Sequence, residues 1–237
     1  INLQQQAHNS WENHFLLKNL HKMTENVYLF VPNLIGYSRI ILAFVSFYYM
    51  ADSPVIFTVC YLLSSLLDAF DGHFARLLGQ SSKFGAMLDM LTDRCATTCL
   101  MVMLSSFFPT YRIVFQFLIS LDITSHWLHM YSSLIKGDQS HKTSTNFFLR
   151  LYYTSRPVLF IMCAGNELFF MALYFLYFSY GPIVFTMNNV PVGLWSLLLY
   201  ISFPIFFVKQ LISVLHLVTA SQDVVAYDVA ERRKTNS

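Results

Sequence analysis

Four aspartates stand close together in a stretch of the sequence that is rich in apolar residues. Asp68 and Asp71 are three residues apart and Asp89 and Asp93 are four apart, so each pair shares one face of a helix. If the short segment between the pairs joins two antiparallel helices, the four carboxylates meet in one polar pocket. Such an all-oxygen ligand set favours Mg²⁺ or Mn²⁺. Four acids can hold two ions, which stabilise the attacking and leaving oxygens of a phosphoryl transfer.

The residues between the two pairs suit a phosphate ligand. Gly72 lets a backbone approach closely, and Arg76 offers a guanidinium fork for a diphosphate. Ser82 stands at a helix start, where it can cap the helix or donate to a ligand. Gly85 removes a side chain where two helices converge. Each residue also has an ordinary structural explanation as a cap, a solvated charge or a packing position.

The elements that must position these residues are membrane helices. The chain has 237 residues, of which 55% are hydrophobic and 12% are charged, against about 25% charged residues in soluble domains. We therefore predict an all-α integral membrane protein with six transmembrane helices. The predicted spans are roughly 32–50, 55–78, 84–108, 113–135, 155–178 and 192–219.

The segments outside these spans complete the predicted organisation. Residues 11–30 mix basic and apolar side chains, which favours an amphipathic helix on the membrane surface, with a solvated helix as the alternative. We expect an N-terminal extension at 1–29, a six-helix domain at 30–220 and a C-terminal tail at 221–237.

The distribution of basic residues predicts the orientation. Lys and Arg gather in the N-terminal segment, in the loops after the second and fourth spans and in the tail, whereas the opposite loops hold only Arg112. By the positive-inside rule, both termini and the four aspartates face the cytoplasm. A formal net charge of +2 without a long basic run argues against nucleic-acid binding.

The complete spacing identifies a family. Asp68, Asp71 and Gly72 begin a pattern that matches DxxDGxxARx₈GxxxDxxxD at every specified position, and on it the chain resembles the CDP-alcohol phosphotransferase family. Gly36 replaces the Thr that many members carry in a PNxxT segment, which is compatible with members that use inositol. Further segments are similar to the eukaryotic inositol-using members: FVPNLIGYSRI, FGAMLDMLTDRC, LDITSHWLHMYSS, LYYTSRP, CAGNELF and KQLISVLHLVTA.

The resemblance implies an activity and assigns residues to it. The implied reaction transfers the phosphatidyl group of CDP-diacylglycerol to myo-inositol and releases CMP. The implied ligands are Asp68, Asp71 and Asp89 for one ion, and Asp68, Asp89 and Asp93 for the other, with Asp93 also the general base. The implied CDP-lipid contacts are Gly72, Arg76 and Ser82. A homodimer in the endoplasmic reticulum membrane is implied in the same way.

Inositol requires a polar cavity, because buried hydroxyl groups need hydrogen-bond partners. The polar residues inside the predicted spans are the candidates, and we assign Arg94, Arg156 and Lys209 to the pocket. The full set of candidates is Arg94, Asp122, His126, His129, Arg156, Asn166, Glu167 and Lys209. Arg156 is preferred because it begins the fifth span on the cytoplasmic side, although it can instead pair with lipid phosphates and Lys209 can snorkel. The helical spacing of Asp122, His126 and His129 favours a structural hydrogen-bond network over a zinc site.

Other functions remain open at this point. Within the family, the acceptor can be glycerol 3-phosphate or serine, or the donor can be CDP-choline or CDP-ethanolamine. From a different class, the four acids can line the pathway of a divalent-cation transporter, although they all lie at one membrane face. A catalytically inactive scaffold is a further alternative, but a structural role does not require all four carboxylates.

Overall fold

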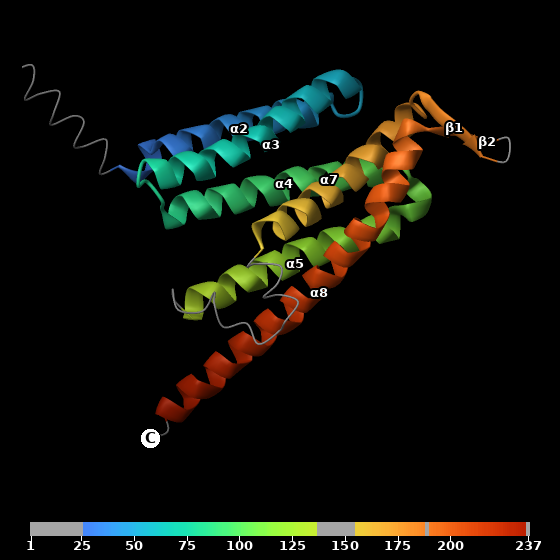
Figure 1. Ribbon diagram of the computed structural model, residues 1–237. Helices are drawn as coiled ribbons and strands as arrows, with labels where there is room; N and C mark the ends of the chain where they lie inside the picture. Colours follow the sequence, from blue (N-terminus) through green and yellow to red (C-terminus); the bar gives the residue numbers. More distant parts are fainter. Residues whose placement is uncertain (1–25, 137–154, 188–189, 236–237) are drawn as a thin grey trace, which may run out of the picture. The chain divides into compact units, whose positions relative to one another are not determined.

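The structure is a computed structural model that describes residues 26–136, 155–187 and 190–235 (Figure 1). The chain divides into two compact units, Ile1–Ala96 and Thr97–Ser237, and the boundary lies inside helix α4 (Lys83–Phe107). The predicted amphipathic helix lies outside the described residues up to residue 25. Its last residues form a short 3₁₀ helix, η1 (Val27–Leu29).

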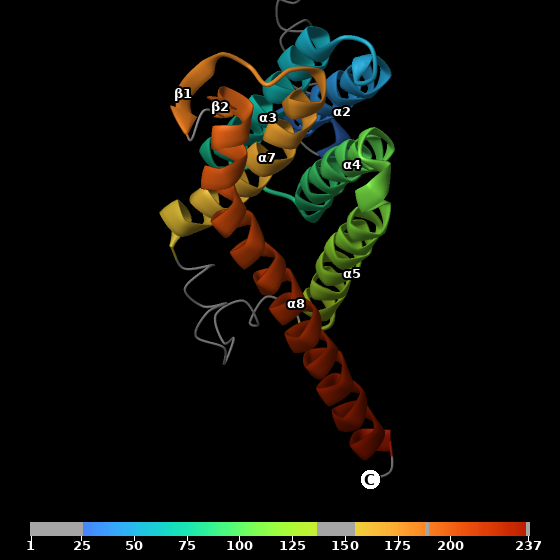
Figure 2. The same ribbon diagram turned by 90° about the vertical axis from the view of Figure 1, so that its right-hand side faces the viewer.

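The first unit is built on a helical hairpin of α2 (Val31–Tyr49) and α3 (Pro54–Leu77). The two helices lie side by side along their length in Figure 1 and are again neighbours in the turned view of Figure 2. Each has a proline in its first turn, Pro32 and Pro54, where the missing N–H costs no helical hydrogen bond. The hydroxyl of Ser64 in α3 donates to the carbonyl of Arg39 in α2 at 3.2 Å. The hairpin therefore holds the carboxyl end of α3 beside the first half of α2.

The loop from α3 to α4 is fixed at three points. Gly79 ends α3 with a positive φ of 63°, and the amide of Gln80 donates to the carbonyl of Ala75 at 2.9 Å, which is the Schellman arrangement of a helix end. The side-chain Oε1 of Gln80 accepts from the amide of Val31 at 2.9 Å. The loop is thereby tied to the start of α2, and α4 begins at a defined place.

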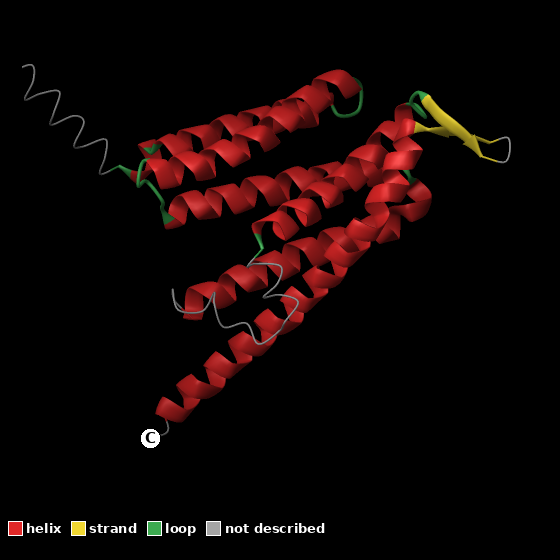
Figure 3. Cartoon of the chain, in the orientation of Figure 1, coloured by secondary structure: helices red, strands yellow, loops and turns green. Residues whose placement is uncertain are grey.

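The second unit contains the rest of α4, the 3₁₀ helix η2 (Pro109–Tyr111), α5 (Arg112–Lys136), α7 (Arg156–Phe178) and α8 (Leu194–Thr235) (Figure 3). Helix α8 packs against both α5 and α7. Hydrogen bonds between polar side chains join the helices of this unit across the apolar interior. Thr97 of α4 donates to Glu167 of α7 at 2.9 Å, and Gln210 of α8 donates to Asn166 of α7 at 3.0 Å. Helix packing in this unit thus includes specific hydrogen bonds.

Part of the polar network predicted for the fourth span is present in α5. Nδ1 of His126 lies 2.8 Å from the carbonyl and 3.4 Å from the carboxylate of Asp122, one turn earlier. One turn later, the ring of His129 stacks on that of His216 from α8 at 5.2 Å. The described contacts thus join Asp122 to His126 within α5, whereas His129 is described in a ring contact with α8. A hydrogen-bond network of all three residues stays a prediction.

Helices occupy all six predicted spans, but they differ in whether each is by itself long and apolar enough to cross a membrane. Helices α2, α3, α7 and α8 are each long and apolar enough to cross a membrane. The helices Lys83–Phe107 and Pro109–Ile135 pass only together, as a pair bent by 119°. The described residues therefore contain four candidate spans, or five if the bent pair is one span. A helical multi-pass membrane protein is confirmed, and six spans stay a prediction.

Two features differ from the prediction. An antiparallel hairpin of β1 (Ile183–Met187) and β2 (Val190–Gly193) occupies the connection before α8, where the prediction had a turn and the first residues of the sixth span. Its β-branched and apolar residues favour strands. Helix α8 also continues past 219 to Thr235, since that segment has neither Gly nor Pro. Most of the predicted tail is therefore helical.

Candidate metal and phosphate site

The four predicted aspartates surround one buried guanidinium group, that of Arg39 in α2. Its Nη1 donates to Oδ2 of Asp71 and Oδ1 of Asp89, both at 2.7 Å. Its Nη2 donates to Oδ1 of Asp93 at 2.6 Å and lies 2.8 Å from Oδ1 of Asp68. Asp68 and Asp71 belong to α3, and Asp89 and Asp93 belong to α4. Each terminal nitrogen therefore joins one carboxylate of α3 to one of α4.

The burial of these groups is graded. The Arg39 side chain is 2% exposed and that of Asp71 is 11% exposed, whereas those of Asp68, Asp89 and Asp93 are 40%, 44% and 39% exposed. The guanidinium thus lies on the buried side of the cluster and three acids lie on the accessible side. Asp71 lies six residues before the end of α3, which places it about 9 Å from that end along the helix axis.

Arg39 is the residue that the sequence prediction missed. It stands within the apolar run FVPNLIGYSRI, and a charge inside a membrane helix is costly unless a partner compensates it. This cost is the signal in the sequence that points to Arg39: a buried positive charge requires a negatively charged partner, and the four acids supply the compensating charge. Nε of Arg39 is buried and has no hydrogen-bond partner among the described residues, so the two terminal nitrogens alone bind the acids.

Three of the acids lie close enough together to hold a cation. One carboxylate oxygen each from Asp68, Asp71 and Asp89 lie within 4.8 Å of one another. These are the residues that the family resemblance assigns to the first ion, and their oxygens fit Mg²⁺ or Mn²⁺. In the described part of the chain, Asp93 is not a member of this group, and a second ion stays a prediction.

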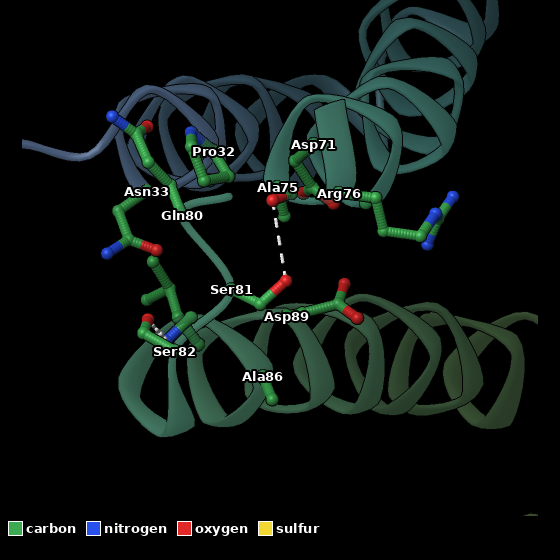
Figure 4. Close-up of a pocket in the computed structure, with 14 residues that line it drawn as sticks. Pro32, Asn33, Asp71, Ala75, Arg76, Gln80, Ser81, Ser82, Ala86 and Asp89 are labelled. Carbon is green, nitrogen blue, oxygen red and sulfur yellow. Dashed lines mark hydrogen bonds between the residues drawn. The ribbon is translucent and has the colours of Figure 1, made fainter. Parts of the chain in front are cut away.

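A cavity of about 210 Å³ adjoins the acids (Figure 4). All three predicted CDP-lipid contacts, Gly72, Arg76 and Ser82, line it together with two of the acids. Its walls come from α2, α3, α4 and the loop between α3 and α4. The lining residues are Pro32, Asn33, Gly36, Asp71, Gly72, Ala75, Arg76, Gln80, Ser81, Ser82, Gly85, Ala86, Leu88 and Asp89.

The local structure of this cavity explains two of the predicted residues. Oγ of Ser82 accepts from the amide of Gly85 at 2.9 Å, so Ser82 caps α4 as predicted, and its own hydroxyl proton can still reach another acceptor. A Cβ on Gly85 would lie 2.7 Å from Oδ1 of Asn33 in α2. Gly85 therefore permits the close approach of two helices, as the sequence predicted.

The electrostatics of the cavity favour an anion. Helix α4 begins at this cavity, and a helix N-terminus attracts negative charge. The exposed side chain of Arg76 adds a full positive charge. The cavity thus offers donors for phosphate oxygens beside an acidic cluster suited to a cation, as a metal-bound diphosphate requires.

The three candidate acceptor residues belong to three different helices. Arg94 follows Asp93 in α4 and is half-buried, within the first unit. Lys209 is 6% exposed in α8, and Arg156 is the first residue of α7, both in the second unit. A pocket formed by these three residues stays a prediction.

Comparison with known proteins identifies the family. The sequence profile of CDP-alcohol phosphatidyltransferases matches residues 29–195. CDP-diacylglycerol–inositol 3-phosphatidyltransferase of Homo sapiens is 54% identical over 213 residues, which cover 89% of this chain and 98% of the human protein. The enzymes of that name from Schizosaccharomyces pombe and Saccharomyces cerevisiae are 49% and 43% identical, over 88% and 89% of this chain and 94% of each relative.

No solved structure matches the chain. The family match covers the described first unit, with its acidic cluster and cavity, and most of the second. Together with identities near one half across almost the full length of the relatives, these findings leave no ambiguity at the level of the family. The chain belongs to the CDP-alcohol phosphatidyltransferase family.

Proposed function

We propose that this chain transfers the phosphatidyl group of CDP-diacylglycerol to myo-inositol, giving phosphatidylinositol and CMP. The proposal rests on the similarity to a human enzyme named for this reaction. This chain is 54% identical to that enzyme, and the alignment covers 98% of the human protein. The gathering of the signature aspartates beside a cavity supports it. The closeness of the match favours inositol over serine or glycerol 3-phosphate as the acceptor.

The proposed cofactor is Mg²⁺ or Mn²⁺, with two ions in the site. Asp68, Asp71 and Asp89 would hold one ion, and Asp68, Asp89 and Asp93 would hold the other. Bound ions would neutralise the diphosphate and stabilise the charge that develops on the departing CMP. The oxygen triplet of Asp68, Asp71 and Asp89 supports the first of these positions.

The proposed diphosphate site uses the residues of the cavity. Gly72 leaves room for the ligand on the α3 side. Among the described residues, and apart from its chain neighbours and the backbone of its own helix, only the Arg76 side chain lies within 4 Å of the place where its Cβ would be. The Arg76 guanidinium would bind diphosphate oxygens, and the Ser82 hydroxyl would donate to one of them. These donors would orient the lipid so that its β-phosphorus faces the acids.

Asp93 is the proposed general base. An inositol hydroxyl oxygen forms a bond to the β-phosphorus as the bond from that phosphorus to the CMP oxygen breaks, and the hydroxyl proton passes to the Asp93 carboxylate. Positioning and partial deprotonation of a weakly acidic alcohol are the remaining parts of the barrier. Arg94, Arg156 and Lys209 stay the proposed contacts of the inositol ring.

The proposed setting is the endoplasmic reticulum membrane, with six spans at 30–220, an extension at 1–29 and a tail at 221–237. The site would face the cytoplasm, because basic residues such as Arg76 and Lys83 flank the loop beside it. Family resemblance also supports a homodimer. Light scattering in detergent would test the dimer, and accessibility of a cysteine introduced at Ser81 in sealed microsomes would test the orientation.

The test of the reaction is CMP release by the purified protein in detergent. The protein receives CDP-diacylglycerol, Mg²⁺ or Mn²⁺, and myo-inositol, serine or glycerol 3-phosphate as the acceptor. We expect release that requires both the metal and inositol. Release with another alcohol alone would change the acceptor but keep the mechanism. Mn²⁺ flux into sealed vesicles without CMP release under any condition would overturn the proposal in favour of a transporter.

A further inference from the structure

Arg39 touches every acid of the signature, although the signature does not include it. Its guanidinium contacts Asp68, Asp71, Asp89 and Asp93 at 2.6 to 2.8 Å. Four carboxylates this close repel one another, and burial strengthens the repulsion because the local dielectric constant is low. A nearby cation therefore lowers the free energy of the cluster whenever no divalent ion is bound.

We propose that Arg39 is the positioning residue of the metal centre: its guanidinium holds the carboxylates of α3 and α4 together from the buried side, so that the site stays assembled without a divalent ion. The inference rests on the metal site proposed above. It assigns a role to a residue of α2 that neither the signature nor the ligand set contains.

The geometry allows the guanidinium and a divalent ion to be bound together. Arg39 contacts one oxygen of each carboxylate, and a carboxylate has two oxygens that accept. Arg39 itself is 1% exposed, whereas Asp68, Asp89 and Asp93 are accessible on their outer side. An ion can therefore approach from the outer side while the guanidinium remains in place.

Two observations make this a positioning role and not a substrate contact. Arg39 is not among the described residues that line the cavity beside the acids. In addition, each terminal nitrogen connects one acid of α3 with one acid of α4, which only a planar fork with two donor nitrogens can do. A lysine at this position keeps the charge but cannot reproduce these bridges.

The test measures thermal unfolding of the full chain in detergent, without substrate, in EDTA and in Mn²⁺. The variants are Arg39→Met and Arg39→Lys, and the control is Lys83→Met, which removes an exposed charge at the start of α4. We expect a small Mn²⁺-induced rise in Tm for the wild type and the control. For Arg39→Met the rise should be larger by at least about 5 °C, with Arg39→Lys between the two.

The possible outcomes separate this inference from the proposed metal site. Equal losses of Tm in EDTA and in Mn²⁺ would show that Arg39 only packs, and would overturn the inference alone. Mn²⁺ binding to the wild type is measured directly by electron paramagnetic resonance. Absence of binding there would overturn the metal site and the inference together.

A charge-compensating variant keeps the test decisive if Arg39→Met folds poorly. Asp71→Asn should lower the Tm of the wild type in EDTA, because it weakens a buried ion pair. In the Arg39→Met background the same change should raise the Tm, because it removes one of four repelling charges. A fall in Tm in both backgrounds would contradict the inference.

Discussion

A Cβ on Gly85 would lie 2.7 Å from Oδ1 of Asn33. This distance is shorter than real contacts of a Cβ, so a side chain at residue 85 would force the buried Asn33 side chain or the helix backbone to shift. Gly85→Ala should therefore destabilise the first unit by about 1–3 kcal/mol through overpacking. A lower Tm in detergent checks this expectation, and an unchanged Tm would show that Asn33 moves aside without cost.

Gly72→Ala provides the matched comparison. The nearest atom to its added Cβ is Nη1 of Arg76 at 3.5 Å, which is an ordinary contact. The Tm should stay the same or rise, since alanine is a better helix former than glycine by about 1 kcal/mol. CMP release should nevertheless fall by at least about tenfold, because the methyl group fills the space proposed for the diphosphate. Normal kcat/KM would remove Gly72 from the ligand site.

Asp89→Asn tests the acids as metal ligands. Asp89 contributes to the oxygen triplet with Asp68 and Asp71, and an amide is a neutral and weaker ligand for Mg²⁺. We expect metal-dependent CMP release to fall by at least about 100-fold. Asp228→Asn in the C-terminal part of α8 is the control and should keep normal release. Full activity of Asp89→Asn at the same Mg²⁺ concentration would exclude Asp89 as a ligand.

Glu167 should matter for stability and not for chemistry. It accepts from the buried hydroxyl of Thr97 at 2.9 Å. Glu167→Ala leaves that hydroxyl without this acceptor and should cost about 1–3 kcal/mol, whereas Glu167→Gln retains a carbonyl acceptor and should cost less. Tm values rank the two variants. CMP release per folded molecule should match the wild type, and a large loss of kcat in Glu167→Gln would instead indicate a catalytic role.

The helices of the site are predicted well from the sequence, because the residue patterns that indicate a helix are local. The spacing of Asp68, Asp71, Asp89 and Asp93 placed each pair on one helix face, and the structure brings all four together around Arg39. The ranges of these helices follow from long apolar runs, with a proline at the start of α2 and of α3. Residues of one helix face can be recognised from sequence periodicity alone.

The role of Arg39 is not predicted by the sequence, because it depends on a contact between helices. It stands 29 residues before the first signature acid, and no periodicity connects the two. The cost of burying an unpaired charge predicts that a partner exists but does not say which residue it is. A metal ion and a cation of the chain can both compensate four acids, and the spacing of the acids does not distinguish the two.

The hairpin before α8 was missed for a different reason. The run IVFTMNNVPV holds two β-branched segments around two asparagines, which is a hairpin signal. The neighbouring apolar residues also fit a membrane helix, and short apolar segments do not distinguish the two. The strand pairing of Phe185 with Val192 resolves this ambiguity through contacts that the sequence pattern does not contain.

The central claim is the transfer of a phosphatidyl group to inositol, and its most direct measurement is the incorporation of labelled myo-inositol into lipid. Purified wild-type protein receives CDP-diacylglycerol and Mn²⁺, and parallel samples contain EDTA or the Asp93→Asn variant. We predict labelled phosphatidylinositol in equal amount to the CMP released, lost in EDTA and reduced at least about 100-fold in Asp93→Asn. CMP release without labelled lipid would contradict the account.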